Sequence, residues 1–302
     1  MSVMLNYYGV PHTQIDISSS IKPHYDDRNV TPEELVAYVN EQTELQAAVF
    51  RGGDIDLLRN LLKAGFPVIV EKGYEPDEWQ GWMGHYLTLI GYDDEAQQFT
   101  SLDTYLGPWD SSGRPITYEE LAFRWSQFNH AFLVVYRPFE AEEVATLLGP
   151  AYTDQAVMWQ NAATAAETAV SERPDDAFAW FNLGAGLTEL GNLNGDEALY
   201  TAAATAFDQS RIAGLPPRML WYQFQPYTAY IQSGRIDEAL ALASAVMQSD
   251  GGWHVEESHF YQGAAYEAAG NADLARSAYK RALDIKPTYL EATQALNGLV
   301  LQ

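Results

Sequence analysis

Two neighbouring stretches decide the fold of the first part of the chain, GHYLTLIGYDD at residues 84–94 and FTSLDTYLG at residues 99–107. Both contain short runs of apolar and β-branched residues, and an acidic turn separates them. This pattern predicts a β-hairpin. His85 stands at the start of the first strand and Asp103 near the end of the second. The hairpin could therefore bring these two side chains together.

A histidine beside a carboxylate is typical of a nucleophilic catalytic site. The imidazole acts as a general base and the carboxylate orients it, but the nucleophile must come from a third residue. The chain has no cysteine, which excludes a thiol nucleophile, disulfides and thiolate metal sites in this sequence. Spacing alone favours the structural interpretation, in which His85 starts a strand and Asp103 lies in a turn.

Composition predicts a folded protein with room for two domains. The chain has 302 residues, of which 47% are apolar and 19% charged. Its formal net charge of −24 and its 17 Lys and Arg residues argue against nucleic-acid binding and against docking on anionic membranes. No run approaches the roughly 18 apolar residues of a spanning helix. We therefore expect no nucleic-acid partner and no membrane-spanning segment.

Residues 1–138 mix helix and strand signals. Thr31 begins a helix as its N-cap, with a proline at the first helical position and Glu34 completing a capping box. Asp54 caps a second helix, which Gly65 ends. The apolar runs at 66–71 and 131–136 predict buried strands, and a further capped helix opens at Thr117. Helices followed by antiparallel strands predict an α+β domain.

From about residue 155 onward the strand signals disappear and alanine-rich helical pairs replace them. The best-formed pair covers residues 259–287 and resembles a tetratricopeptide repeat. Its small residues let two helices approach, an aromatic ring fills the space between them, and a proline ends the second helix. The residues that carry the resemblance are Gly263, Tyr266, Gly270, Ala275, Tyr279, Ala282 and Pro287.

Earlier stretches repeat this pattern more loosely. Tyr230, Gly234 and Ala239 occupy the positions that Tyr266, Gly270 and Ala275 occupy later. We expect about three repeats and a capping helix near residues 290–296, which makes a short all-α solenoid. The predicted organisation is a first domain at 1–138, a link at 139–154 and a repeat domain at 155–302.

The first domain resembles the papain-like cysteine peptidases of the C39 type, which are related to the leader-cleaving domains of bacteriocin exporters. The resemblance covers nearly all of residues 1–138. It rests on the opening helix at 1–9 and on the segments at 66–70, 82–86 and 102–107. It implies a papain-like α+β fold with His85 as general base and Asp103 as the group that orients the imidazole.

The resemblance also implies two residues that this sequence does not contain. In the family a Cys-Gly-Pro leads into the opening helix and carries the nucleophile, and a glutamine just upstream helps to build the oxyanion hole. Here the sequence begins inside a helix without an N-cap, which predicts that it is truncated before the catalytic cysteine.

These observations predict a protein that binds peptide or protein without cleaving it. One alternative is an active cysteine peptidase whose nucleophile lies upstream of a mis-assigned start. Another is a non-enzymatic scaffold in which the first domain only supports the repeats. Compartment and oligomeric state stay open, and the resemblance is compatible with export of the full-length protein.

Aromatic residues are the candidate peptide-binding groups. Trp79 and Trp82 lie in and beside a polar loop that leads to His85, where they could wall a cleft or pack in the core. In the repeats, the first helix of each pair would present an aromatic groove with acidic edges. Alternatively, these aromatics pack against the first domain or a neighbouring repeat. The groove residues are Phe178, Phe181, Trp221, Phe224 and Phe260.

We predict neither a metal nor a cofactor. The acidic pairs at 26–27 and 93–94 lack the alternating spacing of a calcium loop. His254 and His259, with two glutamates between them, make a zinc site conceivable, but the surface of a repeat helix is the favoured interpretation.

Overall fold

The computed structural model describes residues 1–24 and 26–299. The chain divides into two compact units, which we describe separately. The first unit comprises Met1–Ile17 and Thr31–Leu183, and the second comprises Ser18–Val30 and the chain from Gly184 onward. The first contains an antiparallel sheet and the second is helical, which confirms the predicted combination of an α+β domain and an all-α region.

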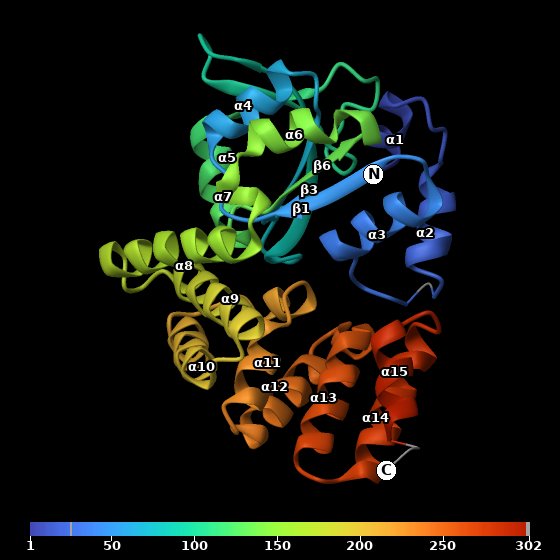
Figure 1. Cartoon of the computed structure of the whole chain (residues 1–302), viewed down its shortest axis with the longest axis vertical. Coiled ribbons are helices and arrows are strands. Elements are labelled where there is room, and N and C mark those ends of the chain that lie inside the picture. Colours follow the sequence, from blue (N-terminus) through green and yellow to red (C-terminus); the bar gives the residue numbers. More distant parts are fainter. Residues whose placement is uncertain (25, 300–302) are drawn as a thin grey trace. The chain divides into compact units, whose positions relative to one another are not determined.

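A six-stranded antiparallel sheet forms the centre of the first unit (Figure 1). The strand order is β1-β6-β2-β3-β4-β5. The predicted hairpin is the β3–β4 pair, whose turn follows the pairing of Asp93 with Gln98. The strands are β1 (Gln46–Phe50), β2 (Val68–Tyr74), β3 (Met83–Asp93), β4 (Gln98–Leu102), β5 (Arg114–Thr117) and β6 (Phe132–Tyr136).

Three helices of the first unit, α3, α4 and α5, begin at the predicted caps Thr31, Asp54 and Thr117. The Thr31 hydroxyl accepts from the Glu34 amide, and the Glu34 carboxylate accepts from the Thr31 amide at 2.7 Å. Asp54 caps α4 by accepting from the Leu57 amide at 2.7 Å. Helix α2 (Gln14–Ile21) begins in the first unit and ends in the second. The other helical elements are α1 (Ser2–Tyr7), α3 (Pro32–Gln42), α4 (Ile55–Lys63), α5 (Tyr118–Trp125), η1 (Ser126–Phe128), η2 (Pro138–Glu140), α6 (Ala141–Leu148), α7 (Pro150–Thr153) and α8 (Gln155–Glu172).

The core of this unit lies between the sheet and its helices. Helix α3 packs on β1, α4 on β3 and α5 on β2. Buried apolar side chains alternate along β3 at Leu87 and Leu89, while Val68, Ile69 and Val70 form a continuous buried run in β2. Residues 139–154, for which the sequence predicts a link, are largely helical, and α6 packs against α4.

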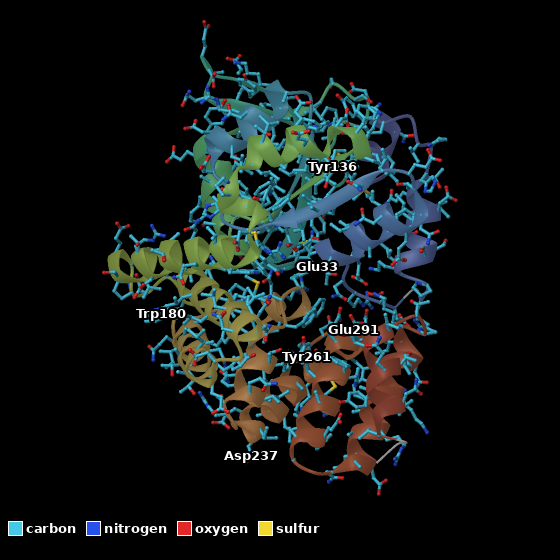
Figure 2. The ribbon with its side chains drawn as sticks, in the orientation of Figure 1. Glu33, Tyr136, Trp180, Asp237, Tyr261 and Glu291 are labelled. Atoms are coloured by element: carbon cyan, nitrogen blue, oxygen red, sulfur yellow. The ribbon has the colours of Figure 1, made fainter. Side chains whose placement is uncertain are left out.

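Charged side chains are also buried beside this core. Arg51 is only 5% exposed and donates to Glu33, labelled in Figure 2, at 2.9 Å. Glu71 in β2 is buried as well, and burial raises the pKa of its carboxyl to about 8, although the charge of Arg51 opposes this shift. Glu71 is therefore mostly protonated at neutral pH.

The second unit is a series of helices in which consecutive members pack on one another from α10 to α15 (Figure 1, yellow to red). Helix α9 begins in the first unit and ends in the second. The elements are α9 (Ala177–Asn194), α10 (Glu197–Ile212), η3 (Pro217–Trp221), α11 (Gln225–Gln232), α12 (Ile236–Gln248), η4 (Gly252–His254), α13 (Glu256–Ala268), α14 (Ala272–Ile285) and α15 (Leu290–Gly298).

The α13–α14 pair has the predicted packing of small and aromatic residues. Tyr279 is 1% exposed, and its ring lies against Gly263 so closely that a Cβ there would lie 2.5 Å from two ring atoms. The Tyr279 hydroxyl donates to Glu267 at 2.7 Å. Tyr261, labelled in Figure 2, stacks on Tyr227 with ring centroids 5.1 Å apart.

Candidate functional site

The β3–β4 hairpin places His85 and Asp103 side by side. Thr88 pairs with Leu102 in the ladder, so Asp103 continues the register opposite Leu87. His85 lies two residues from Leu87 and therefore on the same face of β3. Diagonal neighbours of this kind are within reach of long side chains. The predicted proximity of His85 and Asp103 thus has its cause in the register of one hairpin.

The two side chains are joined by a short polar contact. His85 Nε2 lies 3.1 Å from Asp103 Oδ1. The same oxygen accepts from the backbone amides of Tyr105 at 2.8 Å and Leu106 at 2.9 Å. Because a carboxylate only accepts, the bond places the imidazole hydrogen on Nε2 and leaves Nδ1 as the basic atom. Exposed fractions are 13% for the His85 side chain and 3% for that of Asp103.

The hydrogen bonds to Asp103 keep it ionised. Burial alone would raise the pKa of this carboxyl, but the bonds from His85, Leu106 and Tyr105 outweigh burial and lower the pKa to about 2. A permanent negative charge at this point orients the ring and would stabilise an imidazolium if His85 accepted a proton. The pair therefore has the arrangement of a general base with its orienting group.

Comparisons with known protein families identify both parts of the chain. Residues 1–133 match the model of the Peptidase_C39 like family, and residues 158–211 and 228–289 match a tetratricopeptide-repeat model. The chain joins a peptidase C39-like domain to tetratricopeptide repeats. No curated protein sequence matches it.

Two solved structures are similar to parts of the chain. One is described as the crystal structure of MamA: it is 15% identical, covers 49% of this chain and 84% of its own, and has a TM-score of 0.40. The other, from Bacillus anthracis, is described as a C39-like peptidase: it is 19% identical, covers 45% of this chain and 85% of its own, and has a TM-score of 0.36.

Two tyrosines that sequence reasoning missed flank the imidazole of the C39-like domain. The Tyr74 ring lies 5.2 Å from the His85 ring, and the Tyr105 ring lies 6.3 Å from it. Tyr105 is 49% exposed, and its hydroxyl donates to Gln80 at 3.0 Å. The position of Tyr105, two residues after Asp103, is the sequence feature that could have predicted its place beside the imidazole.

A buried lysine is the second feature that sequence reasoning missed. Lys72 pairs with His85 across the β2–β3 ladder and is 3% exposed. Its ammonium group lies 4.9 Å from the centre of the Tyr74 ring. Burial, assisted by the positive charge of Arg124, lowers the pKa of Lys72 to about 8. The sequence feature that could have identified Lys72 is its position in a strand that is otherwise largely apolar.

The two candidate tryptophans have different environments. Trp79 is 82% exposed and is available to a ligand. The Trp82 ring packs between the rings of Phe128 and Phe178, with centroid distances of 5.6 and 5.5 Å. Its indole nitrogen donates to the Gln127 side chain at 2.7 Å. Phe178, predicted in a repeat groove, thus packs against the C39-like domain, which was the alternative interpretation.

The remaining groove residues do not form the predicted exposed surface. Phe181 is 1% exposed and Trp221 is 8% exposed, so the expectation that they face a ligand is wrong. Phe260 packs against Tyr279 and Tyr289, and Phe224 stacks on Tyr261 at 6.1 Å. The rings of Phe224 and Phe260 thus contact other aromatic rings of the second unit.

The residues of the conceivable zinc site serve other contacts. His259 is 2% exposed, so it does not lie on a helix surface as expected, and its Nε2 bonds to the Trp253 carbonyl oxygen at 2.9 Å. Across residues 1–24 and 26–299, no group of three His, Asp or Glu side chains could hold a metal ion. Within the same residues, no helix has the length and apolar character needed to cross a membrane.

Proposed function

We propose that the C39-like domain binds an extended peptide beside His85 and Asp103 and does not hydrolyse it. One observation supports this most directly: two backbone amides hold the Asp103 carboxylate, which in turn orients the His85 imidazole, while the sequence contains no cysteine. The base of a peptidase site is thus retained without a thiol for it to activate.

Exposed aromatic side chains near the dyad supply the contact surface for a peptide. Tyr105 lies beside the imidazole, and the Trp109 indole donates to the carbonyl oxygen of Thr104, the residue after Asp103, at 3.2 Å. Trp79 and Trp109 are 82% and 77% exposed, which is unusual for tryptophan in a folded chain. Large exposed aromatics of this kind commonly anchor binding interfaces.

Without a nucleophile, the site lacks most of the means to break an amide bond. A positioned base alone contributes about 10²–10⁴-fold to rate, far below the acceleration of a complete enzyme. Binding does not depend on the nucleophile, because it uses the aromatic groups and the polar atoms around them.

Affinity selection from a random decapeptide library tests this proposal. We expect wild-type protein to enrich a set of peptides, and Tyr105→Ala to lose at least about tenfold in affinity for them, the loss typical of a contact residue worth 1.4 kcal/mol. Tyr7→Ala is the matched control, because Tyr7 is 56% exposed in α1 and bonds to Gly65 instead. Equal affinity of both variants would contradict the proposal.

The same dyad geometry favours a second candidate, an active cysteine peptidase completed by a thiol outside this sequence. Translating the DNA directly upstream of the first codon tests it. An in-frame Cys-Gly-Pro, together with hydrolysis by the extended protein that His85→Ala abolishes, would support the peptidase. A stop codon in that position would exclude it.

A further inference from the structure

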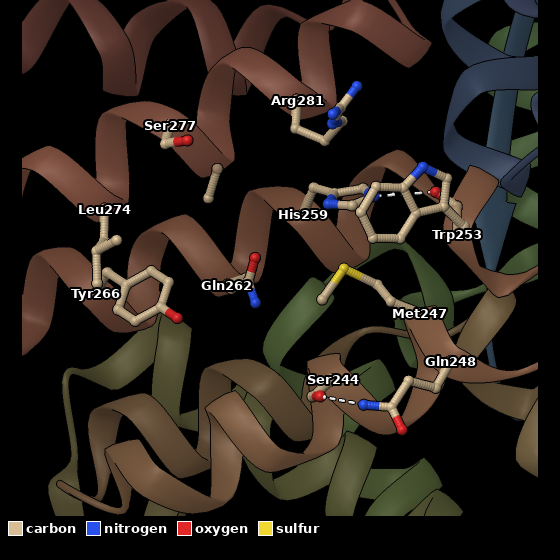
Figure 3. Close-up of a pocket in the computed structure, with 11 residues that line it drawn as sticks. Ser244, Met247, Gln248, Trp253, His259, Gln262, Tyr266, Leu274, Ser277 and Arg281 are labelled. Carbon is tan, nitrogen blue, oxygen red and sulfur yellow. Dashed lines mark hydrogen bonds between the residues drawn. The ribbon is translucent and has the colours of Figure 1, made fainter.

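The second unit contains a pocket whose lining residues all differ from those of the His85–Asp103 site. It has a volume of about 470 Å³, within the usual range for ligand sites. Helices α12, α13 and α14 and the turn η4 line it, and Figure 3 shows side chains from all four around one space. On α13 its residues are His259, Gln262 and Tyr266. They lie on a different face from Phe260, which sequence reasoning assigned to the concave groove.

The charge of this pocket is opposite to that of the chain. Arg281 lines it, and no carboxylate is among the lining residues that the structure describes. The chain as a whole carries a formal charge of −24. Arg281 contacts Asp284 at 3.4 Å, but both side chains are about half exposed or more, and such pairs contribute little. The guanidinium is therefore available to an anionic ligand.

The aromatic wall of the pocket is fixed in place. His259 Nε2 must donate to the Trp253 carbonyl oxygen, because a carbonyl only accepts, and the two rings meet edge to face with centroids 4.9 Å apart. The Arg281 guanidinium lies 5.5 Å from the centre of the Trp253 ring. Cation and indole thus form one surface at the rim, beside Met247 (Figure 3).

Some polar side chains in the pocket make no hydrogen bond to another lining residue and could bond to a ligand. Figure 3 draws hydrogen bonds for Ser244 with Gln248 and for His259 with Trp253. Among the lining residues drawn, Gln262 and Tyr266 have no such bond, and the Gln262 amide points into the space between α12 and α14. A primary amide can both donate to and accept from a peptide backbone.

We propose that this pocket binds a segment of an acidic peptide. A carboxylate of the segment pairs with Arg281, a neighbouring apolar side chain packs on Trp253 and Met247, and the backbone bonds to Gln262. Arginine suits this role because its planar fork matches a carboxylate with two parallel hydrogen bonds. The proposal is independent of peptide binding at His85 and Asp103.

Fluorescence anisotropy with two labelled peptides tests the proposal. The probes are Ala-Leu-Glu-Leu-Ala and its counterpart Ala-Leu-Gln-Leu-Ala, both with blocked ends. We expect the glutamate peptide to bind wild-type protein at least tenfold more tightly than the glutamine peptide. Arg281→Gln should weaken binding of the glutamate peptide by about tenfold and leave the glutamine peptide unchanged, as expected for the loss of one charge-assisted pair.

Arg276→Gln is the matched control, because Arg276 also lies on α14, pairs with Asp273 and does not line the pocket. Trp253→Ala provides a second variant, and circular dichroism verifies that each variant is folded. Equal binding of the two peptides, no binding of either at millimolar concentration, or equal effects of Arg281→Gln and Arg276→Gln would overturn the proposal. Loss of binding in Tyr105→Ala but not in Arg281→Gln would also overturn it, by assigning the peptide to the C39-like site.

Discussion

Asp103 is the residue on which the candidate site depends. Its Oδ1 atom accepts from one imidazole and two backbone amides, so it fixes both the ring of His85 and the turn that follows β4. The side chain is almost completely buried, and a buried carboxylate is tolerated only where such bonds replace water. The dyad is thus a structural unit as well as a chemical one.

Asp103→Ala should lower the free energy of unfolding by about 2–3 kcal/mol at neutral pH, because it removes hydrogen bonds to a charged, buried group. The folded-state pKa of Asp103 is about 2, below that of an ordinary carboxyl. The stabilisation by the ionised group is therefore complete above the unfolded-state pKa of about 4 and is lost as pH falls toward 2. Urea denaturation at several pH values measures this.

The control for this prediction is Asp110→Ala, since Asp110 bonds only within its own exposed turn to Ser112. We expect the free energies of unfolding of the two variants to differ clearly at neutral pH and to become similar as the pH falls toward 2. A constant difference across this range would contradict the assigned role of the Asp103 charge.

Glu71 gives a pH dependence of the opposite sign. Its folded-state pKa of about 8 lies above the value of an unfolded glutamate, so the folded protein holds a proton that the unfolded chain releases. Stability contributed at this position therefore falls as pH rises from about 4.5 toward 8. Glu71→Gln should remove this pH dependence, because glutamine does not titrate. At pH 8 the free energy of unfolding of the variant should exceed that of wild type by a few kcal/mol, which is the order set by the pKa difference between the folded and unfolded states. Thermal or urea unfolding of both proteins at pH 5 and pH 8 measures this difference. An equal gain in stability of Glu71→Gln over wild type at the two pH values would contradict the prediction.

At the scale of elements, the close approach of α13 and α14 requires a glycine at position 263. The Tyr279 ring occupies the space that a side chain at position 263 would need, and the ring is buried and cannot move aside. Close helix packing thus outweighs the ordinary disadvantage of glycine inside a helix, which is about 1 kcal/mol relative to alanine.

Gly263→Ala should therefore destabilise the repeats by about 1–3 kcal/mol, the cost of forcing extra volume into a packed core. Gly298→Ala serves as the control, because a Cβ at the end of α15 meets nothing within 4 Å. Thermal unfolding followed by circular dichroism compares the two. If Gly263→Ala melted at or above the wild-type temperature, the packing account of this helix pair would be wrong.

The β3–β4 hairpin explains why the site could be anticipated from sequence. Apolar runs on either side of an acidic turn predict the hairpin, and a register shift between Leu89 and Gly91 then sets Asp103 opposite Leu87, on the same face as His85. The sequence pattern predicts the hairpin but not this shift. Helix starts at Thr31, Asp54 and Thr117 were equally predictable, because each cap is a local hydrogen bond between residues three apart.

At the scale of the whole molecule, contacts between distant segments limited what sequence could predict. The pairing of Trp82 with Phe178 joins residues far apart in the chain, and no local pattern encodes it. Phe181 and Trp221 have the spacing of a binding face, yet tertiary packing buries them. Tyr74 and Lys72 reach the dyad across the β2–β3 ladder, a pairing that only the assembled sheet defines.

We propose that both parts of the molecule bind peptide, each by different chemistry. The C39-like domain offers exposed aromatics beside an oriented imidazole, and the repeats offer an arginine beside an indole. Tetratricopeptide repeats indicate protein interaction in general, so the two sites together fit a protein that holds peptide segments.

The central claim is that the His85–Asp103 site binds peptide without cleaving it. The most direct test incubates a library-selected peptide with wild-type protein and with His85→Ala, following the peptide's intact mass and its dissociation constant together. We expect wild-type protein to bind the peptide and leave it intact, and His85→Ala to bind it more weakly. Cleavage by wild-type protein that His85→Ala abolishes would contradict it.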